Sequence, residues 1–519
     1  MNKKRIRFST LIIAIATLLI AMTSCNAGAG IGTVTTTTAP TSADVCNGSH
    51  TDANDDGSCD RCREYLIVVI DFYALNDLHG QIFDSKDQPG VDEMTTYLAK
   101  AEQTDDHTVI LSSGDMWQGS AESNLTHGEM MTEWMNEIGV VSMTLGNHEF
   151  DWSDSYISSN TSLAEFPFLA INVYDVSTGE RVEYAQPSVT VQCGNAKIGI
   201  IGAIGDCYSS ISSDKVQNVE FKVGDELTAL VKEESDRLRA EGCDYIVYSI
   251  HDGLAKSGGT VATDRELSSF YDIVLSGGYV DLVFEGHTHY DYVLRDIKGV
   301  YHVQGGGYNT AISHVEIRLN YVTDTSAVSV AETVSSNEYD KFEPDPIVRE
   351  LSEKYADAIS RGDELLGTAN GYISGKTLQQ LCAETYLSFG LERWGDRYDI
   401  ALGGGYIGIR SPKHLEKGDI FYRDLYSLFP FDNNICICSI SGRNLLNRFI
   451  NTSNSNYFIA LNDDLRVNDI DPNATYYVIV DMYSALYAPN RLTVVEVCEE
   501  EIYARDLLAQ YIREGNPIR

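Results

Sequence analysis

The chain has 519 residues, of which 43% are hydrophobic and 22% charged, as is usual for a globular protein with large buried cores. A chain of this length is expected to form two domains. The formal net charge of −38 excludes a nucleic-acid partner that is bound by neutralising its phosphates. The same charge repels any phosphate-bearing ligand, so a site for one needs local cations.

The first 25 residues resemble an export signal. Basic residues between positions 3 and 7 precede an apolar stretch from Leu11 to Met22, which is shorter than the roughly 20 residues of a membrane span. The sequence "MTSC" resembles a bacterial lipobox, in which Cys25 is lipidated and becomes the mature N-terminus. Ordinary secretion, with Cys25 removed, is the alternative. We expect an exported, extracellular or cell-surface protein whose only membrane attachment is a lipid anchor.

Residues 26–64 are predicted to form a Thr-rich tether followed by a small metal-binding module. The candidate ligands of this module are Cys46, His50, Cys59 and Cys62. Their C-x-x-C pair is typical of a tetrahedral zinc site. The overlapping pattern D-x-N-x-D-G from Asp52 resembles a calcium loop, but Arg63 stands where that loop needs a glutamate. Structural zinc, structural calcium and a metal-free polar linker all remain open.

From Leu66 onward, β-branched apolar runs alternate with helix-length polar segments, which predicts an α/β fold. Five of these runs end in side chains that bind metals. In chain order these side chains are Asp77 and His79, then Asp115, then Asn147, His148 and Asp151, then His251, then His287 and His289. In open α/β sheets the carboxyl ends of the strands meet at one edge, where sites form.

Each of these residues taken alone is more often structural than a metal ligand. Five occurrences in the same topological place predict a metal centre, because a buried charge without a partner costs several kcal/mol. Seven of these side chains (Asp77, His79, Asp115, Asn147, His251, His287 and His289) are candidate ligands, more than the three or four of a single catalytic zinc. Two divalent ions bridged by Asp115 fit better, and such a pair can clamp a phosphoryl oxygen and activate a water. The mixed ligands suit zinc, manganese or iron, so the metals are not identified.

The motifs "DLHG", "GDMWQGS", "GNHEFD", "HDG" and "GHTH", in this order, resemble those of the calcineurin-like metallophosphoesterases. More narrowly, the chain resembles the bacterial 5′-nucleotidase / UDP-sugar hydrolase / 2′,3′-cyclic-nucleotide phosphodiesterase family, from about Leu66 to the C-terminus. The resemblance implies a four-layer α/β/β/α metallophosphatase domain at residues 65–340 and a linker helix at 341–364. An α/β substrate-binding domain of the 5′-nucleotidase type would follow at 365–519.

The resemblance also implies roles for the strand-end residues. The first metal would bind Asp77, His79, Asp115 and His289, and the second would bind Asp115, Asn147, His251 and His287. His148 would stabilise the transition state or protonate the leaving oxygen, and Asp151 would orient its ring. Asn147 would also contact the substrate phosphate.

In the C-terminal half, Arg410 follows a glycine-rich turn and can grip a phosphate, with a surface ion pair as the alternative. The family places two base-stacking aromatic residues at Phe431 and Tyr483, and a base-binding amide at Asn433. Without the family, the two aromatic residues would more often belong to the core. The ribose-binding aspartate that the family has is missing, with Asn490 as its nearest polar substitute.

The sequence therefore predicts an extracellular dinuclear-metal phosphoesterase, a 5′-nucleotidase that converts nucleotides to nucleoside and phosphate. A 2′,3′-cyclic-nucleotide phosphodiesterase or a UDP-sugar hydrolase on the same centre is the alternative. A surface nucleotide-binding protein with a vestigial metal site is the alternative of another class. The expected partner is a nucleotide and not a nucleic acid, and the oligomeric state cannot be read from the sequence.

Overall fold

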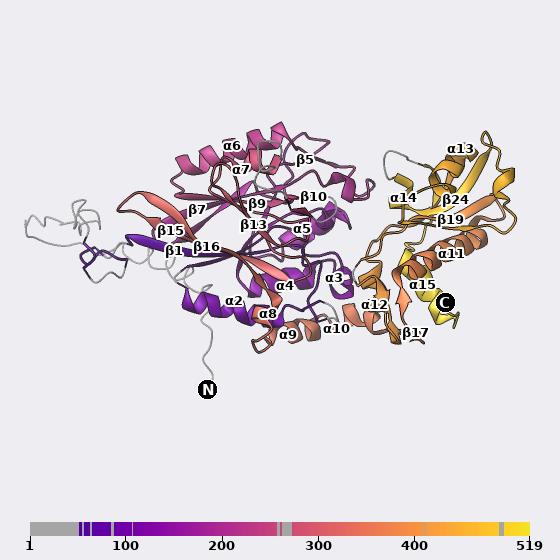
Figure 1. Cartoon of the computed structure of the whole chain (residues 1–519), viewed down its shortest axis with the longest axis horizontal. Helices are drawn as coiled ribbons and strands as arrows, with labels where there is room; N and C mark the ends of the chain where they lie inside the picture. The colour runs from indigo at the N-terminus through magenta and orange to yellow at the C-terminus, as the bar shows by residue number, and fades with distance from the viewer. Residues whose placement is uncertain are drawn as a thin grey trace, which may run out of the picture.

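The structure is a computed structural model that describes residues 51–53, 57–62, 65–84, 88–105, 107–256, 260–261, 272–410, 412–486 and 492–518. The predicted export signal with Cys25, the tether, and Cys46 and His50 of the metal module lie outside these residues. Cys59 is buried and Cys62 is half-buried. The four-ligand module therefore stays a prediction. Figure 1 shows two bodies, an N-terminal and a C-terminal domain, joined by a short linker.

The N-terminal domain contains two six-stranded sheets. The first has the order β16 (Thr325–Ser335), β15 (Ala311–Asn320), β1 (Ile67–Leu75), β2 (Thr108–Ser112), β3 (Val140–Thr144) and β4 (Phe168–Leu169). The second has the order β13 (Tyr292–Arg295), β14 (Tyr301–Gln304), β12 (Leu282–Phe284), β9 (Tyr245–His251), β7 (Ala196–Ile204) and β6 (Ser188–Cys193). The central strands β1 to β4 are parallel, as are β7, β9, β12 and β14.

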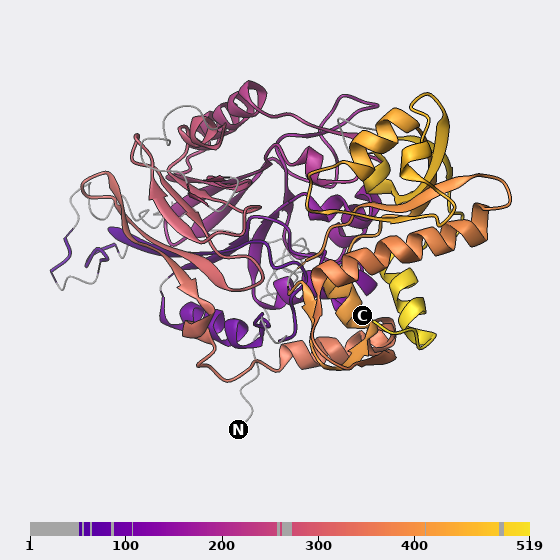
Figure 2. The ribbon, with the colours of Figure 1, turned by 45° about the vertical axis from the view of Figure 1, so that its right-hand side comes forward.

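Side-chain alternation along these strands explains the layers. In β1, Ile70 and Phe72 face the second sheet, while Tyr73 and Leu75 face the helices on the outer side. The outer helices are α2 (Asp92–Thr104) and α4 (Glu129–Glu137) on the first sheet, and α6 (Asp225–Ala240) and α7 (Asp272–Gly277) on the second. The resulting α/β/β/α order, visible in Figures 1 and 2, confirms the predicted four-layer fold.

The predicted linker helix is interrupted. Helix α9 (Ile347–Lys354) ends before Tyr355, and α10 (Ala356–Ile359) and a 3₁₀ turn (Ser360–Asp363) follow. Val348 and Leu351 of α9 are buried in the core of the N-terminal domain. No glycine or proline stands between Ile347 and Ile359, so the sequence carries no signal for this break.

The C-terminal domain is built on one five-stranded sheet. Its order is β23 (Tyr457–Leu461), β19 (Ile400–Tyr406), β24 (Thr475–Asp481), β22 (Ile435–Ser441) and β25 (Thr493–Val497). The long helix α11 (Gly375–Trp394) and helix α15 (Ala504–Arg513) pack together on one face, as Figure 2 shows. The Ser374 hydroxyl caps α11 by accepting the backbone N–H of Thr377. This mixed α/β architecture is the one predicted for the second domain.

The two domains meet through helix α3 (Ala121–Leu125), which lies just beyond the loop that carries Asp115. Ala121 belongs to the hydrophobic core of the C-terminal domain. The Asn124 amide donates to the carbonyl of Pro430 at 2.8 Å, and Arg423 of helix α12 (Tyr422–Leu428) pairs with Glu122 at 3.1 Å. Within the described residues, no helix is both long and apolar enough to cross a membrane.

Candidate metal centre and substrate pocket

The structure brings all seven predicted metal ligands to one edge of the two sheets. Each lies at or just beyond the carboxyl end of a parallel strand. Asp77 and His79 follow β1, Asp115 follows β2, Asn147 follows β3, His251 ends β9, and His287 and His289 follow β12. Because the two sheets pack face to face, their ligand-bearing ends converge from both sides. The strand ends that the sequence singled out therefore lie together in the structure, and their role as metal ligands stays a prediction.

Six of the seven side chains fall into two adjoining sets. One donor atom from each of Asp77, His79 and His289 lies within 4.8 Å of the others, and the same holds for Asp115, His251 and His287. A third group, His79, Asp115 and His148, is equally close, and the Nε2 atoms of His79 and His289 are 3.0 Å apart. The first two sets are parts of the two ligand groups that the family resemblance implies, and those groups stay a prediction.

The hydrogen bonds of the imidazoles show that the site suits cations. His79 Nδ1 donates to the carbonyl of Gln118 at 2.9 Å, and His251 Nδ1 donates to that of Ser113 at 2.7 Å. Both rings therefore turn Nε2 toward the site, and the Nε2 of His79 carries a lone pair because burial lowers the pKa of His79 well below its usual value. Around His251 Nε2, Asp115 Oδ2 and Asn147 Oδ1 each lie at 3.1 Å. Such a convergence of electron pairs fits divalent cations, and carbonyl acceptors on Nδ1 are usual behind metal-bound histidines.

The pKa values of the clustered histidines also fit a site for cations. Burial lowers the pKa of His287 to about 4 and that of His289 to about 3, so both rings are neutral and able to bind a metal at neutral pH. Burial alone would also lower the pKa of His251, but the adjacent Asp115 carboxylate outweighs it and raises that pKa to about 10. A site that retains a proton so strongly favours positive charge.

Strain in the backbone is concentrated at this site. Five of the seven predicted ligands, namely Asp77, His79, Asp115, His287 and His289, have φ between 50° and 70°, where side-chain-bearing residues are uncommon. Such conformations cost of order 1–3 kcal/mol each and cluster at functional sites. Close packing adds a further constraint, because a Cβ at Gly146 would come within 2.3 Å of Asp115 Oδ1. The fold therefore maintains an arrangement that local preference opposes.

His148 has both ring nitrogens occupied. Its Nδ1 donates to Asp151 Oδ2 at 2.6 Å, as expected for a carboxylate that orients the ring. Its Nε2 accepts from Arg410 Nη2 at 2.5 Å and lies 4.0 Å from Asp115 Oδ2. His148 is thus beside the metal centre while facing the second domain.

Glu149 is a functional residue that the sequence analysis missed. This fully buried carboxylate accepts the backbone N–H groups of Asp115, Met116, Trp117 and Gly146 at 2.7–3.3 Å. It therefore joins the loop that carries Asp115 to the loop that carries Asn147. An acidic residue directly after His148, where a buried strand ends, was the available signal.

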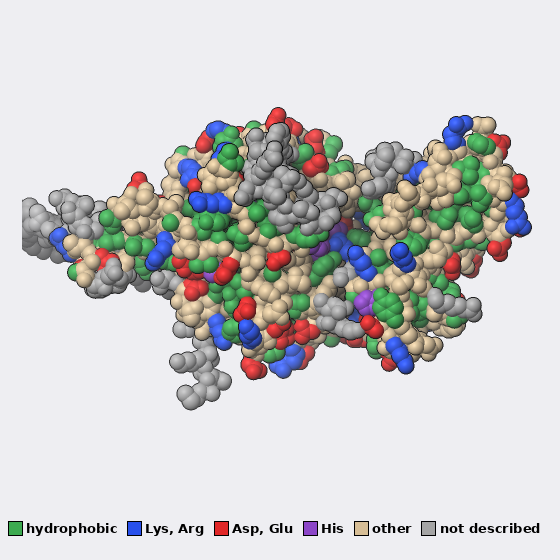
Figure 3. Space-filling model, viewed as in Figure 1, with side chains coloured by type: hydrophobic (Ala, Val, Ile, Leu, Met, Phe, Trp, Pro, Cys, Tyr) green, Lys and Arg blue, Asp and Glu red, His purple; other side chains and the backbone are tan. Residues whose placement is uncertain are grey.

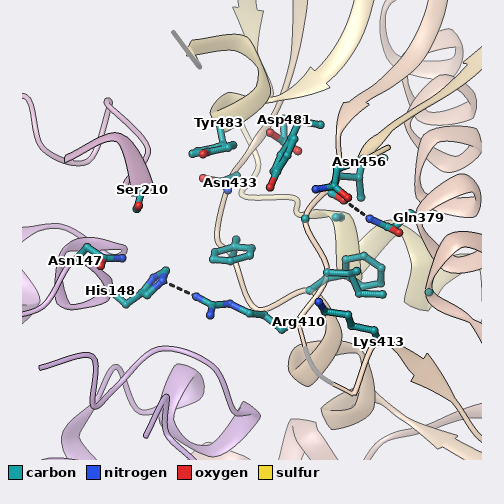
Figure 4. Close-up of a pocket in the computed structure, with 18 of the residues that line it drawn as sticks. Asn147, His148, Ser210, Gln379, Arg410, Lys413, Asn433, Asn456, Asp481 and Tyr483 are labelled. Atoms are coloured by element: carbon teal, nitrogen blue, oxygen red, sulfur yellow. Dashed lines mark hydrogen bonds between the residues drawn. The ribbon is translucent and has the colours of Figure 1, made fainter. Parts of the chain in front are cut away.

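A single cavity of about 1020 Å³ connects the metal centre to the C-terminal domain. Asn147 and His148 lie on one side of it, and Arg410, Asn433 and Tyr483 lie on the other, as Figure 4 shows. Phe431 also lines the cavity, with Arg410 5.3 Å from its ring centroid. Figure 3 shows His and Lys or Arg side chains at the junction of the two bodies, which supplies local cations on an acidic protein.

Buried Arg505 binds the loop that carries Phe431 and Asn433. This guanidinium is 1% exposed, donates to the carbonyls of Phe429 and Phe431, and pairs with Asp432. Other lining residues not predicted from the sequence are Lys376, Lys413, Gln379, Asn456, Tyr406 and Ser210. Asn490, the predicted substitute for the ribose aspartate, lies outside the described residues.

Two family models match the chain in order. The model described as calcineurin-like phosphoesterase matches residues 70–291, and that described as 5′-nucleotidase, C-terminal domain, matches residues 363–467. The first covers the strands that carry the seven clustered side chains, and the second covers Arg410, Phe431 and Asn433. The chain belongs to the 5′-nucleotidase family of calcineurin-like metallophosphoesterases. It is accordingly a metal-dependent phosphoric ester hydrolase.

Known proteins resemble the chain along much of its length. Protein UshA of Yersinia enterocolitica is 24% identical over 499 residues, covering 85% of this chain and 88% of that protein. Endonuclease YhcR of Bacillus subtilis is 27% identical over 413 residues, but the chain spans only 32% of its length. The crystal structure of a putative 5′-nucleotidase from Staphylococcus aureus shares the fold, with a TM-score of 0.64, 18% identity, and coverage of 86% and 97% of the two chains.

Proposed function

We propose that this enzyme is an exported dinuclear-metal 5′-nucleotidase that hydrolyses nucleotides to nucleoside and phosphate. One observation carries the proposal: the cavity of about 1020 Å³ extends without interruption from the clustered Asp and His side chains to Phe431, Asn433 and Tyr483. A ligand that fills it has an anionic group at one end and a flat, hydrogen-bonding group at the other. A nucleotide has both.

In this proposal the catalytic domain spans residues 65–340, the linker 341–364 and the substrate-binding domain 365–519. Asp77, His79, Asp115 and His289 would hold one cation, and Asp115, Asn147, His251 and His287 would hold the other. When bound, such cations would supply Lewis acidity at the phosphoryl group and at the attacking water. Zinc, manganese and iron all suit the donors.

The chain's own residues complete the reaction. Arg410 lies over the centre and contributes positive charge where the phosphoryl oxygens become more negative. His148, with its Nδ1 proton fixed on Asp151, presents Nε2 toward the cavity, where it would stabilise the transition state or protonate the leaving oxygen. Phe431 and Tyr483 stack on the base, and Asn433 binds its edge, where stacking contributes about 1–3 kcal/mol.

The proposed export and lipid anchor depend on the residues before the catalytic domain. The basic and apolar start of the sequence, followed by "MTSC" and a Thr-rich segment, supports export and a lipid anchor on Cys25. A phosphatase held outside the cell by such a tether would release nucleoside and phosphate for uptake. Mass spectrometry of the mature N-terminus after expression in a bacterial host tests this part, because an unmodified residue 1 would contradict it.

A substrate panel tests the activity. AMP, 2′,3′-cyclic AMP, UDP-glucose and an aryl phosphate are each assayed with Mn²⁺- or Zn²⁺-loaded enzyme, alongside elemental analysis. We expect the highest kcat/KM for AMP and close to two metal ions per chain. Hydrolysis of the aryl phosphate alone would contradict a nucleotide substrate, and one ion per chain would contradict the dinuclear centre.

The second candidate is a 2′,3′-cyclic-nucleotide phosphodiesterase or UDP-sugar hydrolase on the same centre. It is favoured by the missing ribose-binding aspartate and by the cations Lys376 and Lys413, which line the cavity in addition to Arg410. A higher kcat/KM for either of these substrates than for AMP would establish it.

A further inference from the structure

The loop "GGGYNT" at residues 305–310 packs directly against the predicted metal ligands, although no predicted role involves it. The backbone N–H of Tyr308 donates to the carbonyl of Asp77 at 2.8 Å. A Cβ at Gly307 would lie 2.7 Å from the ring of His289, so a side chain is excluded there. The Asn76 amide, which also donates to Asp77 Oδ2, joins the backbone of Gly305 at 3.0 Å. This loop therefore forms one wall of the metal centre.

Tyr308 occupies an unfavourable backbone conformation in this wall. Its φ is 54° and that of Asn309 is 56°, so two successive residues with side chains are left-handed. Asparagine tolerates this region, whereas a tyrosine there is a true outlier. The surroundings enforce the turn, because Tyr339 donates its hydroxyl to the Asn309 carbonyl at 2.6 Å and Asn309 donates to Gly90. Backbone strain of this kind persists mainly at functional sites, where it gives a side chain a particular direction.

The Tyr308 side chain links the metal centre to the other domain. Its ring lies 5.0 Å from that of His79 and 5.2 Å from that of His289, between centroids. Its hydroxyl accepts a hydrogen bond from Arg410 Nη1 at 3.1 Å. The second terminal nitrogen of Arg410 donates to His148. The guanidinium is thus held at two points, and both points belong to the N-terminal domain.

We propose that Tyr308 is a positioning residue that holds Arg410 over the metal centre when the two domains are closed. The proposal rests on the proposed function, because it assigns Arg410 to the substrate phosphate. When a phosphoryl group enters, it competes with His148 for one N–H of Arg410, while Tyr308 retains the other. The planar guanidinium therefore keeps the orientation in which its N–H groups can donate to the phosphoryl oxygens.

A double-mutant cycle with Tyr308→Phe and Arg410→Ala tests the proposal. Tyr308→Phe keeps the ring against His79 and His289 and removes only the hydroxyl. The first readout is binding of inorganic phosphate to the Mn²⁺-loaded enzyme by calorimetry, and the second is kcat and KM for AMP and for an aryl phosphate. A matched control is Tyr372→Phe, because Tyr372 is 65% exposed and lies in the other domain.

We expect Tyr308→Phe to weaken phosphate binding and to lower kcat/KM about 10-fold for both esters, as for loss of one hydrogen bond to a charged group. In the Arg410→Ala background the same change should have no further effect, because the partner is gone. Tyr308→Asn, which suits the left-handed backbone but is too short to reach Arg410, should behave like Tyr308→Phe. Metal content should equal that of the wild type in all three.

The proposal would be overturned if Tyr308→Phe weakened phosphate binding equally in the wild-type and the Arg410→Ala backgrounds. Loss of bound metal from Tyr308→Phe would also overturn it. Failure of the nucleotide assignment is distinguishable from both. In that case the wild type would not hydrolyse AMP, but coupling between Tyr308 and Arg410 would still be measured with inorganic phosphate.

Discussion

Arg410 Nη2 lies 2.5 Å from His148 Nε2, although the two residues belong to different domains. Arg410 is held on its own side because its backbone N–H donates to Leu428 at 3.0 Å, and Leu428 ends the helix that packs on α3. The contact that closes the cavity over the metal centre therefore depends on the interface between the domains. In this arrangement of the two domains, the candidate catalytic and substrate-binding residues line one cavity.

Asp115→Asn should abolish turnover and reduce the number of bound metal ions. A carboxylate oxygen of Asp115 lies within 4.8 Å of a ring nitrogen of His79, from one ligand set, and of those of His251 and His287, from the other, so this carboxylate lies between both sets. An amide has one oxygen and no charge with which to bridge two cations. Elemental analysis and initial rates measure the two effects. Near-normal activity would rule out a bridging role.

His148→Ala should lower kcat by about 10²–10⁴ while leaving the metal content unchanged. The ring occupies its two nitrogens with Asp151 and Arg410 rather than with the clustered ligands. Asp151→Asn is the companion variant and should show a smaller loss, because the imidazole remains while its orientation is less favoured. An unchanged kcat in His148→Ala would remove this residue from the reaction.

Phe431→Ala should raise KM for AMP far more than for an aryl phosphate without a nucleobase. The Phe431 ring lines the same cavity as Asn433 and Tyr483 and lies 5.3 Å from Arg410, and stacking on a base is worth about 1–3 kcal/mol. Steady-state kinetics on both substrates give the comparison. Tyr372→Ala removes an exposed aromatic of the same domain and serves as the control. Equal increases in KM for the two substrates would contradict stacking.

Glu149→Gln should reduce metal affinity about 10–100-fold and destabilise the N-terminal domain. The Glu149 carboxylate now accepts hydrogen bonds from backbone N–H groups, and the amide of glutamine would place its own N–H group against some of them. Each buried donor left without an acceptor costs about 1–3 kcal/mol. Metal titration and denaturant unfolding measure the two losses. The exposed Glu165 offers a matched control as Glu165→Gln. If the two variants behaved alike, Glu149 would have no positioning role.

Stability should decline in alkaline solution because of His302. This fully buried ring has Nδ1 2.6 Å from Glu285 and Nε2 3.7 Å from Asp296. Burial alone would lower the pKa of His302, but the two carboxylates outweigh it and raise that pKa from 6.5 to about 9. Because the folded-state pKa is the higher one, the stabilisation is complete below about pH 6.5 and is lost as pH rises through 9.

The expected loss in the free energy of unfolding is about 3 kcal/mol across this window. Urea unfolding between pH 6 and 10 measures it. His302→Gln should flatten the dependence, whereas His414→Gln, a change on the surface of the C-terminal domain, should leave it intact. The same slope in His302→Gln as in the wild type would refute the assignment.

The sequence by itself determined which residues gather at the metal centre. Asp77, Asp115, Asn147 and His287 are far apart in the chain, yet each follows an apolar, strand-like run. Parallel strands place their carboxyl ends at one edge, so strand ends in the sequence become neighbours in space. Glu149 escaped prediction because nothing local shows that its carboxylate turns inward to backbone N–H groups of another loop.

Only the tertiary structure decided how the second domain completes the site. Arg410 meets His148 and Tyr308 across 262 and 102 residues of sequence, and no periodicity or spacing encodes such contacts. They depend on how α3 docks against α12 and on an interruption at Tyr355 in the linker. Relative domain orientation is a sum of many weak packing contacts between distant segments, whereas the strand ends obey a rule of local geometry.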